Sequence, residues 1–161
     1  MNRQWNVFVI VALLLIAAGC GPGATPTPVP TPTAEPEVLA TRNADVVGVW
    51  LMRASPGDVM APTTWNIEHT LEGARTYVIA SGAYKGGKGE GKYWFEGGLY
   101  KVQFPPDPGA SEENYTSLGT YQVYVTRQGG KAVQVRFVVV DDPYVGRKTR
   151  QTYRPLTRVE P

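Results

Sequence analysis

The chain has 161 residues, a formal net charge of +2 and 19% charged residues. Its length leaves room for one domain of roughly 100 to 120 residues after an N-terminal segment that cannot belong to a core, and its small charge excludes the strong field expected of a nucleic-acid-binding protein. The 18 glycines, 14 prolines and 11% aromatic residues indicate a proline-rich piece joined to a turn-rich β domain.

Residues 1–19 have the pattern of an export signal. Arg3 gives a short positive region and Val7–Ala18 an apolar run, which is shorter than the about 20 residues that a membrane helix needs. Small residues then precede Cys20, the one cysteine of the chain. A single cysteine can form neither an intramolecular disulfide nor a cysteine-based zinc site.

The sequence Ala17-Ala18-Gly19-Cys20 resembles the lipobox of bacterial lipoproteins, with alanine at the position where that motif prefers leucine. The resemblance implies that Cys20 receives diacylglycerol, that the signal is cleaved before it, and that the membrane anchors the mature protein outside the cytoplasm. The residues alone leave two alternatives open: ordinary secretion with Cys20 as a plain thiol, and a retained membrane anchor.

Residues 20–43 are predicted to be a disordered linker. Gly21–Glu37 read GPGATPTPVPTPTAEPE, and alternating threonine and proline favours polyproline II, which rises about 3.1 Å per residue. The stretch would therefore hold a domain on the order of 50 Å from its lipid. A plain spacer, an O-glycosylated segment and a proline-rich docking ligand all fit this composition.

Residues 44–161 are predicted to be an all-β domain, because glycine-bounded runs rich in valine, threonine and aromatic residues replace the prolines there. Glycines at Glu72-Gly73, Gly97-Gly98 and Gly129-Gly130 predict tight antiparallel hairpins. We expect a single small up-and-down antiparallel barrel of eight strands, with a sandwich or an open barrel as the alternative. The predicted strands span residues 46–53, 64–71, 75–81, 91–96, 99–104, 119–127, 131–140 and 148–154.

Alternation along these runs predicts which side chains face the interior. Trp94 is expected on the face opposite to its two neighbours, Tyr93 and Phe95. Each large apolar side chain that is buried contributes roughly 1.5 to 3 kcal/mol, which is enough to support a barrel of this size without disulfides. The other predicted inward residues are Trp65, Ile67, His69, Leu71, Tyr121, Val123, Val125, Val133, Val135, Phe137 and Val139.

The segment Asp45–Trp50 carries a G-x-W pattern and resembles the opening of the first strand of lipocalins and related calycin barrels. The segments Gly119–Val123, Val135–Asp141 and Tyr153–Pro155 resemble the closing half of small lipocalin-like barrels in bacterial lipoproteins. The resemblance implies a fold but no single function, because such barrels include binders, a few enzymes and proteins without a known ligand.

The same resemblance implies a structural pair at the closed end of the barrel. Trp50 would pack there against a late arginine, Arg147 or Arg150, whose guanidinium lies on the indole face. Independently of the resemblance, the late basic residues form a stretch that is a candidate contact with anionic lipid headgroups. This stretch comprises Arg147, Lys148, Arg150, Arg154 and Arg158.

The sequence contains no competent catalytic or metal-binding constellation. His69 is the only histidine, has no E-x-x-H spacing, and is interpreted as structural. The serines lie in predicted turns without a nucleophile-elbow pattern, and Gly82–Gly91 lacks the phosphate-binding motif. We therefore predict that the protein is not an enzyme and uses no cofactor or metal.

Two functions fit this sequence. In the first, a hollow barrel binds a small apolar or amphipathic ligand; in the second, a packed barrel acts as a structural or protein-interaction module of the cell envelope. An eight-stranded interior is just wide enough for its own side chains or for one small ligand, so both stay open. The expected partners are the membrane, through the lipid on Cys20, and either a small hydrophobic ligand or an envelope protein, but not nucleic acid. The candidate lining residues are Trp65, Tyr77, Trp94, Tyr121 and Phe137.

Overall fold

The computed structural model describes residues 33–106 and 114–159. The predicted export signal, Cys20 and most of the proline-rich stretch lie outside these ranges. The strands are β1 (Val38–Leu39), β2 (Gly48–Arg53), β3 (Thr64–His69), β4 (Ala74–Ser81), β5 (Lys88–Glu96), β6 (Leu99–Gln103), β7 (Gly119–Gln128), β8 (Lys131–Asp141) and β9 (Leu156–Arg158). A short 3-10 helix, η1 (Asn43–Asp45), precedes β2, and the helix α2 (Val145–Thr152) precedes β9.

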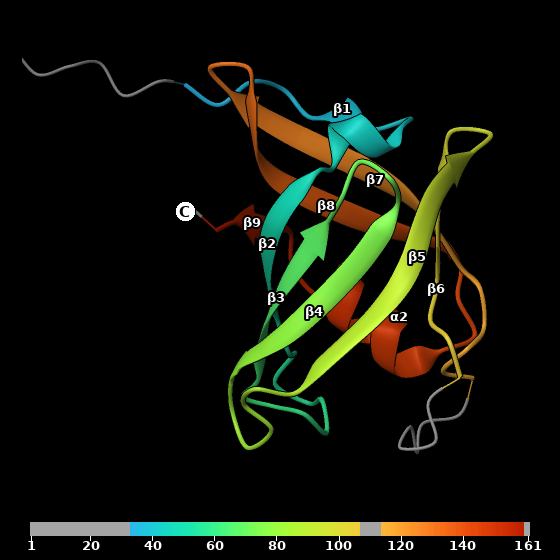
Figure 1. Ribbon diagram of the computed structural model, residues 1–161. Helices are drawn as coiled ribbons and strands as arrows, with labels where there is room; N and C mark the ends of the chain where they lie inside the picture. The colour runs from blue at the N-terminus through green and yellow to red at the C-terminus, as the bar shows by residue number, and fades with distance from the viewer. Residues whose placement is uncertain (1–32, 107–113, 160–161) are drawn as a thin grey trace, which may run out of the picture. The chain divides into compact units, whose positions relative to one another are not determined.

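The strands form one antiparallel sheet that closes on itself (Figure 1). The order β7-β6-β5-β4-β3-β2-β9-β8 returns to β7, because β7 pairs along its length with β8. These eight strands are a closed antiparallel barrel, so the predicted fold class is confirmed. The remaining strand, β1, lies outside the ring and pairs with β7.

The tight hairpins form where glycine allows them. Glu96 pairs with Leu99 and Gln128 pairs with Lys131, so each turn contains two residues. All four turn glycines, Gly97, Gly98, Gly129 and Gly130, have φ between 58° and 77°, which is the left-handed region that residues with a Cβ avoid. These turns were predicted from the sequence and set the antiparallel register of β5, β6, β7 and β8.

The up-and-down order separates two ends of the barrel. The β3–β4, β5–β6 and β7–β8 turns lie at one end, which is the upper end in Figure 1. The long connections of residues 54–63, 82–87 and 104–118 lie at the other, lower end, where α2 also lies.

Side chains from every strand of the ring are buried in the interior. Two predicted inward residues differ: Leu71 is 58% exposed because β3 ends before it, and Val139 is 39% exposed beside a register shift at the end of β8. The rest of the predicted pattern is largely confirmed, since alternate residues of β3, β7 and β8 are buried. The buried apolar residues of the ring are Trp50, Met52, Trp65, Ile67, Ile79, Tyr93, Tyr100, Val102, Tyr121, Val123, Val125, Val135, Phe137 and Leu156.

The predicted eighth strand, residues 148–154, is wrong. Residues Val145–Thr152 form α2, and the barrel is closed by the three-residue strand β9, which pairs with both β2 and β8. The buried side chains of α2 are Arg147, Arg150 and Gln151, which lie on one helical face at positions i, i+3 and i+4. Because this buried face is polar, the helix leaves no apolar periodicity in the sequence.

The folded part also begins before residue 44, within the predicted linker. Residues 35–40, here called the N-terminal strap, run along β7: Glu35 N donates to Arg127 O and Ala40 N donates to Val123 O, both at 2.8 Å. The Glu37 carboxylate accepts three hydrogen bonds from Arg136, at 2.5 to 3.2 Å, which lower the pKa of Glu37. Long-range pairing of this kind overrides the disorder expected from composition.

The ion pair between Glu37 and Arg136 should make a measurable contribution to the free energy of unfolding. Because both side chains are 37% exposed, we expect Glu37→Gln, Arg136→Gln and the double variant to give a coupling of about 0.2–1 kcal/mol in the free energy of urea unfolding. Additive effects of the two single variants would contradict a stabilising strap contact. Amide exchange at Ala40, measured in the same variants, reports whether the strap opens.

Candidate functional site

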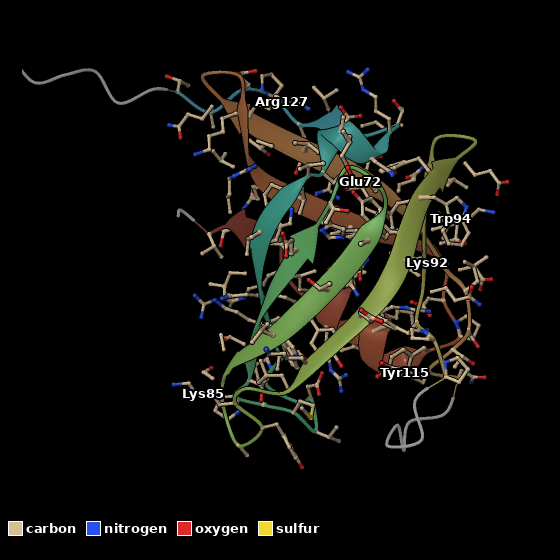
Figure 2. The ribbon with its side chains drawn as sticks, in the orientation of Figure 1. Glu72, Lys85, Lys92, Trp94, Tyr115 and Arg127 are labelled. Carbon is tan, nitrogen blue, oxygen red and sulfur yellow. The ribbon has the colours of Figure 1, made fainter. Side chains whose placement is uncertain are left out.

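The structure divides the five predicted lining residues between two faces of the barrel wall. Trp65, Tyr121 and Phe137 are buried in the interior, with at most 5% of each exposed. Tyr77 is partly buried, and its ring meets Phe104 edge-on at 6.3 Å between centroids. Trp94 is half-buried on the outer face of β5 (Figure 2), so the five residues do not surround one space.

The rings of the interior pack on one another around Tyr100. Its ring is stacked on Tyr93 at 5.4 Å and meets Phe95, Phe137 and Tyr121 edge-on at 5.6, 5.2 and 6.4 Å. Such offset-stacked and edge-to-face contacts stabilise beyond the burial of area. Aromatic side chains therefore occupy the part of the barrel in which an internal ligand would have to bind.

His69 is buried in the same cluster. It is 1% exposed, its Nε2 lies 2.8 Å from the Tyr100 hydroxyl, and its ring meets Tyr93 edge-on at 4.7 Å. Burial, with a smaller contribution from the charge of Arg75, holds the pKa of His69 well below its ordinary value. Burial also raises the pKa of Tyr100 to about 12, so both partners are neutral at physiological pH.

The buried histidine predicts a stability that falls in mild acid. The unfolded chain binds a proton below an ordinary pKa of about 6.5, whereas folded His69 does not, so stability is complete above that pH and is lost as the pH falls. We expect a loss of about 1 kcal/mol between about pH 7.5 and about pH 5.5. Urea unfolding of the wild type and of His69→Gln checks this: the variant should lose less, and equal losses would contradict the assignment.

A buried ion pair fixes α2 at the lower end of the barrel. Arg147 donates from Nε and Nη2 to the two oxygens of Asp142, both at 2.7 Å, and also donates to Ser117 O at 2.8 Å. The same carboxylate accepts the hydroxyl of Tyr121 and the backbone N–H of Tyr144. Burial works against the charge of Arg147, but the hydrogen bonds and charge of Asp142 leave its pKa raised.

Removing one charge of this pair should be costly. The side chains of Arg147 and Asp142 are 2% and 0% exposed, so Asp142→Asn leaves a buried guanidinium without its counter-ion and should cost about 3–5 kcal/mol of unfolding free energy. The neighbouring Asp141 is exposed, so Asp141→Asn is the matched control and should change stability by less than about 0.5 kcal/mol. Similar costs for the two variants would contradict the account.

A second buried cation lies beside this pair. Arg75, 3% exposed on β4, donates to the Gln151 side chain of α2 at 3.2 Å. The guanidiniums of Arg75 and Arg147 lie 5.3 and 5.6 Å from the centre of the Phe104 ring. Strand, helix and loop are thus joined by polar and cation–π contacts where the barrel interior meets α2.

The predicted pairing of Trp50 with Arg147, or with Arg150, is wrong. The residue over the Trp50 ring is Arg158, 5.3 Å from its centre, and a Cβ at Gly48 would lie 2.8 Å from the Arg158 guanidinium. The glycine of the G-x-W pattern therefore makes room for an arginine from β9.

The predicted basic C-terminal stretch is not one surface either. Arg147 is paired with Asp142 inside the molecule. Arg150 donates to both oxygens of Asp58, at 2.9 and 3.2 Å, and also lies over Trp65. Because two of its five cations are buried, the stretch loses the continuous positive surface that contact with lipid headgroups would need.

A groove of about 990 Å³ lies on the outside of the barrel wall, across β4, β5 and β6. Lys92 and Trp94 project into it from β5, and Glu72 borders it from the turn before β4 (Figure 2). Glu72, Glu90 and Lys92 form no ion pair with another described residue. The full lining comprises Glu72, Gly73, Ala74, Glu90, Gly91, Lys92, Tyr93, Trp94, Gln103, Phe104, Pro105, Pro106 and Thr116.

Packed rings support the lower wall of the groove. A Cβ at Gly91 would lie 2.6 Å from Phe104 Cδ1, so this glycine lets Phe104 fold inward past β5. Phe104 is stacked on Tyr115 at 5.2 Å, and Tyr115 meets Tyr144 at 5.6 Å. Sequence analysis named Trp94 only as a lining residue of an interior ligand site. It missed Glu72 and Glu90, because the β3–β4 turn and β5 come together only when β4 pairs with β5.

Within the described ranges, no group of three or more histidine, cysteine, aspartate or glutamate side chains is arranged to hold a metal ion. No helix in that part of the chain is long and apolar enough to cross a membrane. Comparison with known proteins yields no matching family model, curated protein or solved structure. The groove is therefore interpreted from its own chemistry.

Proposed function

We propose that the protein is a bacterial lipoprotein, anchored through Cys20 outside the cytoplasm, whose packed lipocalin-like barrel acts as a protein-interaction module of the cell envelope. Its partner binds in the outer groove of β4, β5 and β6. The observation that carries this proposal is the distribution of aromatic side chains: the rings around Tyr100 are packed on one another, whereas Trp94 is presented to the outside beside charges that have no ion-pair partner among the described residues.

The ring cluster around Tyr100 supports this function over an internal ligand. To admit even a small ligand, Tyr100 would have to separate from rings that it contacts on several sides. Truncating one large aromatic core residue costs about 3–5 kcal/mol in proteins generally, and opening this cluster would sacrifice contacts of the same kind. The described interior is thus organised for stability, which leaves the outer surface for recognition.

The chemistry of the groove suits a protein partner. Trp94 is a large, partly apolar side chain of the kind that anchors protein interfaces, and tryptophan is enriched among residues that dominate their binding energy. Glu72, Glu90 and Lys92 supply charges of both signs around it. Such charges contribute to orientation and specificity when the partner carries complementary groups.

The first experiment asks what the barrel contains. Native mass spectrometry of the mature protein, purified from its own host and followed by organic extraction, should give the mass of the chain and its lipid with no further apolar adduct. A stoichiometric apolar adduct released by the extraction would overturn the packed-module proposal and support the internal-ligand function.

The second experiment asks whether the groove binds a protein. A photo-crosslinking amino acid at Trp94 should give one discrete protein adduct in the cell envelope, whereas the same group at Gln134, a half-buried residue on β8, should not. For the partner so identified, Trp94→Ala should weaken binding by about 2 kcal/mol or more without changing unfolding. Equal crosslinking at both positions would contradict a groove-specific partner.

A further inference from the structure

Two loops at the lower end form a tip that is separate from the groove. The tip, as defined here, consists of residues 54–63, between β2 and β3, and residues 82–87, between β4 and β5 (Figure 1). The loops lie side by side, because the Thr64 and Ser81 hydroxyls at their bases are 2.7 Å apart and a Cβ at Gly82 would meet Thr63.

The first loop is held in a conformation that exposes Val59. The carboxylate of Asp58 is 4% exposed and bound by Arg150, and it accepts the backbone N–H of Met60 at 2.8 Å. Met60 in turn packs against the core. Because both neighbours are held inward, Val59 points outward and is 87% exposed.

The second loop presents an aromatic ring and a cation. Backbone hydrogen bonds from Lys85 to Gly82, from Gly87 to Tyr84 and from Gly86 to Ile79 fix the turn. Tyr84 is 61% exposed, and Lys85 lies at the bottom of the molecule as Figure 2 shows it. The tip therefore displays one aliphatic and one amphipathic side chain on neighbouring ordered loops.

Three cations flank the two loops in the described part of the chain. Arg53, Lys85 and Lys88 form no ion pair with another residue in the described ranges, and the acidic group of the tip, Asp58, is neutralised by Arg150. A single exposed apolar residue on a protein needs no explanation. Two protruding ones on neighbouring loops that are flanked by these cations match the requirements of a membrane interface, where apolar tips enter and cations contact headgroups.

We propose that this tip binds the surface of an anionic lipid bilayer. Val59 and the Tyr84 ring enter the boundary between headgroups and acyl chains, where tyrosine is favoured because its ring is apolar and its hydroxyl is polar. Arg53, Lys85 and Lys88 lie against lipid phosphates and keep their charges at the surface. The proposal goes beyond groove recognition and rests on the proposed lipid anchor only for bringing a bilayer within reach.

A fluorescent reporter at the tip tests this contact. The full precursor is expressed in a host that lipidates it, carries Val59→Cys labelled with an environment-sensitive dye, and is reconstituted in phosphatidylcholine vesicles with or without about 30% phosphatidylglycerol. We expect a blue shift and quenching by nitroxide-labelled lipid in the anionic vesicles. Leu71→Cys is the matched control, because Leu71 is 58% exposed at the opposite end, and its dye should stay unquenched.

Two further measurements complete the test: one reverses the charges of the tip, and the other exposes the protein without an added cysteine to the dye. Lys85→Glu with Lys88→Glu should lower the quenched fraction at Val59 about tenfold. The proposal is overturned if the dye at Val59 is not quenched, if its quenching does not depend on phosphatidylglycerol, or if the dye at Leu71 is quenched equally. If the dye at Val59 is not quenched and the tip binds an acidic protein, the tip is assigned to such a partner instead. Dye uptake by the protein without an added cysteine shows that Cys20 is a free thiol, which identifies failure of the anchor separately.

Discussion

The carboxylate of Asp142 lies where β8 gives way to α2, and Arg147, the Tyr121 hydroxyl and the Tyr144 amide all donate to it. An unpaired carboxylate at this depth would be strongly destabilising, so the three donors must stay together. Tyr121 belongs to the barrel wall and Arg147 to the helix. Their shared acceptor therefore fixes α2 against the interior, and the other contacts of the helix follow from that placement.

Once α2 is fixed, it determines two further features of the lower end. Gln151 meets Arg75 of β4, and Arg150 meets Asp58 of the 54–63 loop. The first contact places a polar layer beneath the aromatic cluster, and the second holds the loop that exposes Val59. A buried pair is not in itself a source of stability relative to apolar packing. Here it specifies one arrangement of helix, wall and loop.

The sequence predicted the parts of the fold that local chemistry determines. Glycine pairs located the hairpins, and alternation identified the inward faces of β3, β7 and β8, because both signals depend on neighbouring residues. It did not predict α2, whose buried face contains Arg147, Arg150 and Gln151 rather than apolar residues. The usual start signal is also missing: Asp142 accepts the Tyr144 amide, but Tyr144 itself is the N-cap residue and makes no side-chain cap hydrogen bond.

Contacts between residues that are far apart in the sequence could not be predicted from local patterns. The strap pairs with β7 and joins Glu37 to Arg136, which lies 99 residues later, and proline content gives no hint of these contacts. Arg158 replaces Arg147 over Trp50 because β9, not the predicted eighth strand, lies beside β2. Alternation placed Trp94 opposite to Tyr93 and Phe95, whereas its chemistry suggested a ligand lining; the structure places it on the outer face of β5.

The strap decides how the linker meets the barrel. Residues 35–40 are held to β7 by backbone hydrogen bonds and to β8 by the Glu37–Arg136 ion pair. The chain joins the barrel at the upper end, where Glu35 accepts the Gly130 amide. The tip is at the opposite end and the groove is on the side wall, so these two surfaces can each bind a partner without displacing the strap.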